Sequence, residues 1–296
     1  MPDVFTENTV SKIALPKNSN LINYSVLNEF YSPSPFRSFS IKYVVDGSEL
    51  YSVNGNKYII KNQQYLLANK FSEGFVEVDS KKSVTGICID VAPNILSEVV
   101  ASYLKPDTSF VDIDLDRFFN TPSFLENKYN ASQTHLGQFM LGLESVLLSN
   151  PTNELNLTNE FYYTLAEKIV TDHIPVFKQF QSIKAVKSET KKDLLRKLYN
   201  GKDYIDSCFT SALSIESIAF EVGLSEYHFF RLFKSVFSVS PHQYIIQKRL
   251  CFAKSILKKE QLDISSVSML SGFSDIYSFS KSFKKHFGYS PSKFLA

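Results

Sequence analysis

A thirteen-residue pattern occurs twice in the C-terminal third of the chain. FFRLFKSVFSVSP, from Phe229 to Pro241, returns as FSKSFKKHFGYSP, from Phe279 to Pro291, with three phenylalanines, a cation at the third position and a final Ser-Pro matched in both copies. Each matched residue lies 50 positions from its copy. Phenylalanines four residues apart share one face of a helix, so the pattern predicts one helical unit that the chain uses twice.

The residues before each copy predict a shorter helix and a tight turn. In the first unit, Ser214 is expected to cap a helix that Gly223 ends, and Ser225 is expected to cap the next helix. In the second unit, Gly272 ends the short helix and Ser274 is the expected cap. Two helices joined by a glycine-containing turn form a helix-turn-helix unit. The expected inward residues are Ile215, Ile218, Ala219, Val222, Phe229, Leu232, Phe233 and Val236, and then Ile264, Val267, Leu270, Phe279, Phe283 and Phe287.

The outward faces of the two second helices predict contacts with double-stranded DNA. Side chains near the start of such a helix enter the major groove, where Arg or Lys reaches guanine acceptors and apolar atoms contact thymine methyl groups. Serine hydroxyls and free backbone N–H groups at the helix starts suit phosphate oxygens. Two such helices in one chain can read a non-palindromic site. The candidate DNA-binding residues are Ser225, Glu226, Tyr227, Phe230, Arg231 and Lys234, and then Ser274, Asp275, Ile276, Tyr277, Ser278, Lys281, Lys284 and Lys285.

The charge of the chain is unevenly distributed. The net charge is +2, but the residues from Lys191 onward carry +7 and the residues before them carry −5. A basic C-terminal third favours a polyanionic partner. A basic stripe alone is also typical of a solvated helix face, so the DNA prediction depends on the repeat.

The N-terminal region predicts a β-sheet. From Phe36 to Val91, aromatic and β-branched residues alternate with polar ones, and Asn54-Gly55 is a strong hairpin signal. Six to eight short strands are typical of a β-sandwich or jelly roll. The side chains of Tyr43, Tyr51, Tyr58 and Tyr65 either line a small-molecule pocket or pack within the sheet.

After Pro93 the pattern becomes helical. Leu136, Phe139, Met140, Leu143, Val146 and Leu147 form one stripe, which either pairs two chains or packs on its own sheet. The stretch from Leu155 is expected to stay helical until Pro175. Residues 181–193 are polar and predict a linker between a domain at 1–180 and a domain at 194–296. The predicted fold class is therefore α+β: an N-terminal jelly roll with trailing helices, and an all-α C-terminal domain with two helix-turn-helix units.

Residues 194–296 resemble the DNA-binding domain of the AraC/XylS family of bacterial transcription regulators. GFSDIYSFSKSFKKHFGYSPSKFLA, which starts at Gly272, is close to the family pattern GFSDxxYFSRxFKKxFGxSPxxYR, although Lys281 replaces the usual arginine and Phe294-Leu295 replaces the usual Tyr-Arg. Ser238 stands where the first unit usually has glycine. The resemblance implies a connecting helix with Arg249, Leu250 and Ala253, and base-facing positions at Tyr227, Phe230, Arg231, Ile276, Tyr277 and Lys281. The N-terminal region resembles, less specifically, the cupin-like sensor and dimerisation domains of the family.

Several kinds of site are not expected. Residues 36–91 contain no histidine, which argues against a metal-dependent cupin enzyme, and no cofactor or metal is expected. The five histidines are scattered, and each is expected to be a surface or packing residue. Cys88, Cys208 and Cys251 offer neither a disulfide framework nor a CxxC site and are expected to be buried thiols. A secretion signal and a membrane span are not expected, so the predicted location is the cytoplasm.

Together these observations predict a sequence-specific transcription regulator and not an enzyme. The expected partner is double-stranded promoter DNA, with RNA polymerase, a small-molecule effector and a second copy of the chain as further expected partners. Activation is the family expectation, and repression is equally compatible with the residues. The alternative hypothesis is a small-molecule-binding cupin protein whose helical domain docks a protein partner.

Overall fold

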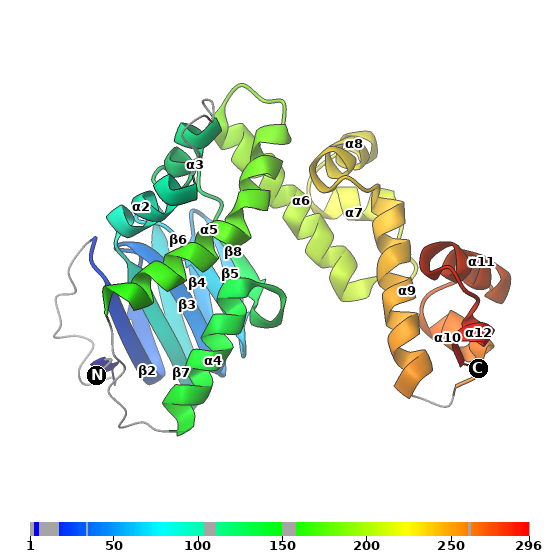
Figure 1. Ribbon diagram of the computed structural model, residues 1–296, viewed down its shortest axis with the longest axis horizontal. Helices are drawn as coiled ribbons and strands as arrows, with labels where there is room; N and C mark the ends of the chain where they lie inside the picture. Colours follow the sequence, from blue (N-terminus) through cyan, green and yellow to red (C-terminus); the bar gives the residue numbers. More distant parts are fainter. Residues whose placement is uncertain are drawn as a thin grey trace. The chain divides into compact units, whose positions relative to one another are not determined.

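The computed structural model describes residues 3–5, 18–33, 35–103, 111–149, 158–259 and 262–295 of the chain. The chain divides into two compact units, Met1–Lys178 and Gln179–Ala296, here called unit 1 and unit 2. Unit 1 contains a sheet followed by helices, and unit 2 is helical in its described part (Figure 1). The predicted α+β fold class is confirmed.

The strands of unit 1 form one eight-stranded sheet. Their order is β1-β2-β7-β3-β6-β8, and β4 pairs with both β5 and β7. All pairs are antiparallel except β1 with β2. Because the first half of β7 pairs with β4 and its second half with β3, the sheet folds over on itself around an interior. The strands are β1 (Asp3–Phe5), β2 (Leu21–Ser32), β3 (Phe39–Asp46), β4 (Ser48–Val53), β5 (Asn56–Lys61), β6 (Gln64–Ala68), β7 (Gly74–Val91) and β8 (Asn127–Asn130).

The predicted hairpin at Asn54-Gly55 is confirmed. Val53 pairs with Asn56, and the two residues between them have φ of 48° and 79°. Positive φ at both central positions of a two-residue loop matches the right-handed twist of the strands, and Asn-Gly accommodates it at low cost.

Helices gather over one face of the sheet (Figure 1). Phe39 of β3 packs edge-on against Phe124, with ring centroids 4.9 Å apart, and also contacts Phe119 at the end of α3. The helices of this layer are α2 (Pro93–Tyr103), α3 (Val111–Phe119), the 3-10 turn η1 (Ala131–Gln133), α4 (His135–Ser149) and α5 (Asn159–Ser182).

Helices α4 and α5 differ from what the sequence predicts or leave it open. The sequence predicts that α5 ends at Pro175. This prediction is wrong, because the helix continues to Ser182. Proline removes only one backbone donor, and the buried side chains of Val176, Phe177 and Phe180 hold the following turns. In α4, Leu136, Met140 and Leu143 are buried within their own unit, whereas Val146 is exposed, so pairing of two chains through this stripe stays a prediction.

Helices occupy both ends of the predicted linker: α5 ends at Ser182 inside it, and the next helix, α6, also starts inside it. Of residues 181–193, those from Ser188 onward belong to α6. The further helices follow the predicted plan closely, and the connecting helix α9 lies between the two helix-turn-helix units (Figure 1). The helices are α6 (Ser188–Cys208), α7 (Ile215–Glu221), α8 (Glu226–Phe237), α9 (Pro241–Lys259), α10 (Ile264–Leu270), α11 (Ile276–Phe287) and α12 (Pro291–Leu295).

The repeated phenylalanines form the cores of the two helix-turn-helix units. Phe229, Phe233, Phe279 and Phe283 are fully buried, as predicted. The prediction for Leu270 is wrong, because its side chain is 53% exposed and Ser271 is buried instead. Four residues after Val267, Ser271 returns to the inward side of α10, whereas Leu270 falls outside that face.

Candidate DNA-binding surface

The first helix-turn-helix unit has the predicted caps. The hydroxyl of Ser214 accepts a 3.0 Å hydrogen bond from the backbone N–H of Ser217, and the hydroxyl of Ser225 accepts one of 3.3 Å from His228. Gly223 has φ of 66°, and the next backbone N–H, of Leu224, returns to the carbonyl of Ala219 at 2.9 Å. This left-handed glycine ends α7 and aims the chain into α8.

The second helix-turn-helix unit uses a different cap. Ser274 was the predicted cap of α11, but Asp275 holds that position, and its Oδ1 accepts a 2.7 Å hydrogen bond from the backbone N–H of Ser278. Hydrogen bonds from the backbone and the hydroxyl of Ser278 lower the pKa of this carboxyl below its ordinary value. The helix starts one residue later relative to Gly272 than α8 does relative to Gly223. That shift removes Ser274 from the cap and leaves its hydroxyl donating to Asp275.

All fourteen candidate DNA-binding residues are exposed. They lie at the starts and along the outward sides of α8 and α11. Asp275 combines exposure with a structural role, since its two carboxylate oxygens accept hydrogen bonds from Ser274 and Ser278. The negative charge of Asp275 is repelled by phosphates and by the acceptor groups of base edges. It is attracted only to donor groups such as cytosine N4.

The two helices end in the same left-handed conformation with different residues. Ser238 follows α8 with φ of 61°, and Gly288 follows α11 with φ of 85°. A side chain with a Cβ atom is strained in this conformation and glycine is not. The departure from the family pattern at Ser238 therefore leaves the backbone geometry unchanged and costs conformational energy.

Arg249 joins the two helix-turn-helix units. This residue of α9 donates from Nε to the carbonyl oxygen of Phe209 at 2.6 Å and from Nη2 to that of Ser211 at 2.8 Å. These carbonyls belong to the segment between α6 and α7. A Cβ atom added to Gly272 would lie 2.5 Å from the carbonyl oxygen of Thr210 in that same segment and 3.0 Å from Arg249 Nε. The turn of the second helix-turn-helix unit thus packs directly on the segment that leads into the first.

Unit 1 contains a charged cluster inside its sheet. Adjacent strands bring together Asn23, Cys88 and Lys42 in one row, with Asp90 and Ser40 in the next. Lys42 Nζ lies 2.6 Å from Cys88 Sγ and 3.6 Å from the carboxylate of Asp90. This cluster was not predicted from the sequence, where polar residues inside the apolar runs FSIKYVV and GICIDV are its signal.

Burial shifts the pKa values of this cluster. It opposes the charge on Lys42, but the Asp90 carboxylate and the Cys88 sulfur raise the lysine pKa above its ordinary value. Burial also raises the pKa of Cys88 to about 11 and lifts the pKa of Glu49 above its ordinary value. Asn23 Oδ1 is buried without a hydrogen-bond partner.

The four tyrosines that were candidates for lining a pocket all bond to protein groups. The hydroxyls of Tyr43, Tyr51 and Tyr65 contact Glu144, Glu49 and Thr134, and Tyr58 donates to the carbonyl of Glu126 at 3.2 Å. The first three side chains are buried. These contacts favour packing over a pocket lining as their role.

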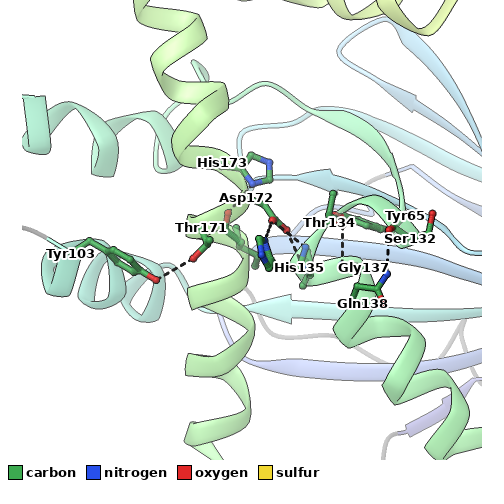
Figure 2. A network of polar contacts seen from close by, with 12 residues as sticks. Tyr65, Tyr103, Ser132, Thr134, His135, Gly137, Gln138, Thr171, Asp172 and His173 are labelled. Atoms are coloured by element: carbon green, nitrogen blue, oxygen red, sulfur yellow. Dashed lines mark hydrogen bonds and ion pairs between the residues drawn. The ribbon is translucent and has the colours of Figure 1, made fainter. Parts of the chain in front are cut away.

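A second polar network ties α4 to α5. Asp172 of α5 accepts hydrogen bonds from the backbone N–H groups of His135 and Leu136, at 3.1 and 2.9 Å, and lies 2.7 Å from His135 Nδ1 (Figure 2). Its carboxylate therefore satisfies the free amides at the start of α4. Next to it, His173 is buried, and burial lowers its pKa to about 4. Its Nδ1 lies 2.8 Å from the carbonyl of Ile169 and must carry the proton there, so Nε2 accepts from the hydroxyl of Tyr129.

Other expected properties concern absent sites. Within the ranges given above, no three His, Cys, Asp or Glu side chains are grouped so as to hold a metal ion. Among the helices of those ranges, none is long and apolar enough to span a membrane. Cys251 is exposed, contrary to expectation, whereas Cys88 and Cys208 are partly buried.

Comparison with known proteins places unit 2 among helix-turn-helix domains. A family model described as a helix-turn-helix domain matches residues 218–296. The probable transcription factor PqrA of Proteus vulgaris is 33% identical over 82 residues, which cover 28% of this chain and 67% of PqrA. The Msm operon regulatory protein of Streptococcus mutans is 33% identical over 145 residues, which cover 48% of each protein.

These similarities cover only part of most relatives. The chain spans about half of the length of the Msm operon regulatory protein and 37% of that of LumQ, a probable transcriptional regulator of Photobacterium leiognathi. A crystal structure of ToxT from Vibrio cholerae is similar over 94% of this chain and 98% of ToxT, with 16% identity and a TM-score of 0.36. A score this low adds nothing to the assignment.

Proposed function

Because the chain belongs to the AraC/XylS family of transcription regulators, we propose that it binds a specific promoter sequence through α8 and α11 together. The observation that carries the proposal is the pair of exposed helix faces whose opposite sides hold the buried phenylalanine cores. Each face can approach a duplex without any rearrangement of its own helix-turn-helix unit. The net charge of +7 from Lys191 onward favours a polyanionic partner.

The proposal assigns roles to the exposed residues. Arg231 and Lys281 occupy matched positions and are proposed to contact base edges, with Arg231 able to bind guanine in two places and Lys281 acting as a point charge. Lys234, Lys284 and Lys285 are proposed to contact phosphates and so to fix the register of the protein on the duplex.

Unit 1 is proposed to regulate this binding. The feature that supports a sensor role is the buried ion pair of Lys42 and Asp90, because the desolvation of two buried charges can exceed the attraction between them. We propose that this pair is kept for regulation. Pairing of two chains, contact with RNA polymerase, activation of transcription and a cytoplasmic location complete the proposal.

In vitro selection from random-sequence duplexes tests the function directly. The full chain is expected to enrich one sequence, to bind it much more tightly than a scrambled duplex, and to lose affinity steeply as salt rises because phosphate contacts release counterions. Equal affinity for selected and scrambled duplexes would show nonspecific binding. Failure to retain DNA at low salt would favour the alternative, in which unit 2 docks a protein.

A further inference from the structure

Helices α8 and α11 carry one repeated exposed stripe. Tyr227, Arg231 and Lys234 stand at positions i, i+4 and i+7, and Tyr277, Lys281 and Lys284 repeat this spacing 50 residues later. Residues so spaced share one side of a helix. Each tyrosine is the second residue of its helix, and the two side chains are 73% and 75% exposed. Two equivalent rings therefore project from the first turns of the two helices.

Each ring has a large apolar neighbour at the surface. Phe230 lies three residues after Tyr227 and is 37% exposed, and Ile276 lies beside Tyr277 and is 46% exposed. Water-exposed apolar side chains gain free energy when an apolar surface covers them. The partner that covers these side chains is expected to be a polyanion, because cations lie on the same stripes.

The base edges of a duplex offer one such apolar group in the major groove. Thymine presents its C5-methyl group there, whereas the other base edges present hydrogen-bond donors and acceptors. The two stripes and their apolar neighbours together present four aromatic or aliphatic side chains, Tyr227, Phe230, Ile276 and Tyr277. Among the same residues, only Arg231 carries a planar guanidinium that can bind guanine in two places. The balance favours methyl contacts over guanine contacts.

We propose that Tyr227 and Tyr277 read thymine methyl groups, so that the bound sequence carries thymine opposite each of the two rings. The inference rests on the DNA-binding function proposed above and specifies the bases that this surface selects. Phe230 and Ile276 extend the apolar contact beside each ring. Arg231, Lys281 and the following lysines hold the helices on the backbone and on neighbouring bases.

Deoxyuridine in place of thymine tests this inference, because it removes the methyl group and keeps every base-edge hydrogen bond. The probe is the duplex obtained by selection, made with thymine or with deoxyuridine throughout both strands. Each contacted methyl is expected to contribute about fourfold in affinity, the value of about 0.8 kcal/mol per buried methylene, so two contacts give about fifteenfold. Replacement of one thymine at a time by deoxyuridine is expected to identify two separate groups of thymines whose methyl groups contribute to affinity.

Variants of the two tyrosines test which group of sensitive thymines each tyrosine ring contacts. Tyr227→Ser is expected to abolish the methyl effect in one group and Tyr277→Ser in the other, while circular dichroism shows unchanged helicity. Tyr31→Ser is the matched control, because this tyrosine is 60% exposed but lies on β2. It is expected to retain both effects.

The possible results separate this inference from the proposed function. Equal affinity for the thymine and deoxyuridine duplexes, with a scrambled duplex still rejected, overturns the methyl contacts and leaves specific DNA binding intact. A methyl effect that both tyrosine variants retain also overturns the inference. Equal binding of the scrambled duplex overturns the proposed function and the inference with it.

Discussion

Arg249 Nε donates a 2.6 Å hydrogen bond to the backbone carbonyl of Phe209, 40 residues earlier in the chain. Arg249 belongs to α9, which packs against α10 and α11, whereas Phe209 follows α6. With its second bond, to Ser211, the partly buried guanidinium ties the connecting helix to the segment that leads into the first helix-turn-helix unit. We therefore expect the spacing of α8 and α11 to depend on this side chain.

Replacement of Arg249 by methionine is expected to weaken this connection. The variant keeps most of the stem volume and loses two charge-assisted hydrogen bonds, at a cost of about 2 to 4 kcal/mol in the free energy of unfolding. Affinity for the selected duplex is expected to fall more than affinity for a scrambled duplex, because only the former needs both helices in register. Lys248→Met, which removes a partly exposed ion pair with Asp206, is the control and is expected to change both affinities alike. A loss of the same size in the two variants would argue against the role of Arg249.

Gly272 and Gly223 form a matched pair of turn glycines. Both have positive φ, so alanine at either position is strained by about 1 to 2 kcal/mol. A Cβ atom added at Gly223 would meet nothing within 4 Å, whereas one added at Gly272 would lie 2.5 Å from the backbone oxygen of Thr210. Gly272→Ala is therefore expected to cost at least about 2 kcal/mol more than Gly223→Ala. Hydrogen exchange in α7 and α8 measures the cost of Gly223→Ala, and exchange in α10 and α11 measures that of Gly272→Ala. Equal costs would contradict the close packing.

Ser238 and Gly288 give opposite predictions for one exchange. Ser238→Gly is expected to stabilise unit 2 by about 1 kcal/mol, and Gly288→Ser to destabilise it by a similar amount. A Cβ atom at residue 288 meets nothing within 4 Å, so the effect there comes from the backbone alone. Urea unfolding followed by circular dichroism gives both values. Changes of the same sign would be incompatible with the shared left-handed conformation.

His173 makes the stability of unit 1 depend on pH. Its folded pKa is about 4, below the ordinary value of 6.5, because burial disfavours the charged ring. The unfolded chain therefore binds more protons between these pH values, and the stabilisation present above pH 6.5 is lost as the pH falls to about 4, by about 3 kcal/mol in all.

His173→Phe is expected to flatten this dependence. Hydrogen exchange in α5 between about pH 7 and about pH 4.5, corrected for the intrinsic exchange rate, measures it. His242→Phe, at an exposed position of unit 2, serves as the control and should leave the slope in α5 unchanged. An unchanged slope in the His173 variant would mean that other groups cause the dependence.

The sequence predicted those features whose cause is local. Phenylalanines every four residues placed Phe229 and Phe279 in the cores, and Asn54-Gly55 placed a hairpin, because spacing and backbone preference decide them. Ser225 was recognised as a cap for the same reason. The repeat also predicted which faces of α8 and α11 are exposed.

Features that depend on tertiary contacts were missed. The extra residue before α11 made Asp275 the cap in place of Ser274, and the packing around Ser271 left Leu270 exposed. Lys42 and Asp90 alternate with apolar residues as on a solvated strand face, but the sheet folds over them and buries both. Pairing between strands far apart in the chain decides that burial, and local pattern does not report it.

A nucleotide-resolution footprint on the selected duplex tests most directly whether one chain uses both helices on one site. If α8 and α11 both enter the major groove, two stretches are protected, of which Arg231→Ala weakens one and Lys281→Ala the other. A single protected stretch, or protection that both variants leave unchanged, would contradict the use of both helices on one site.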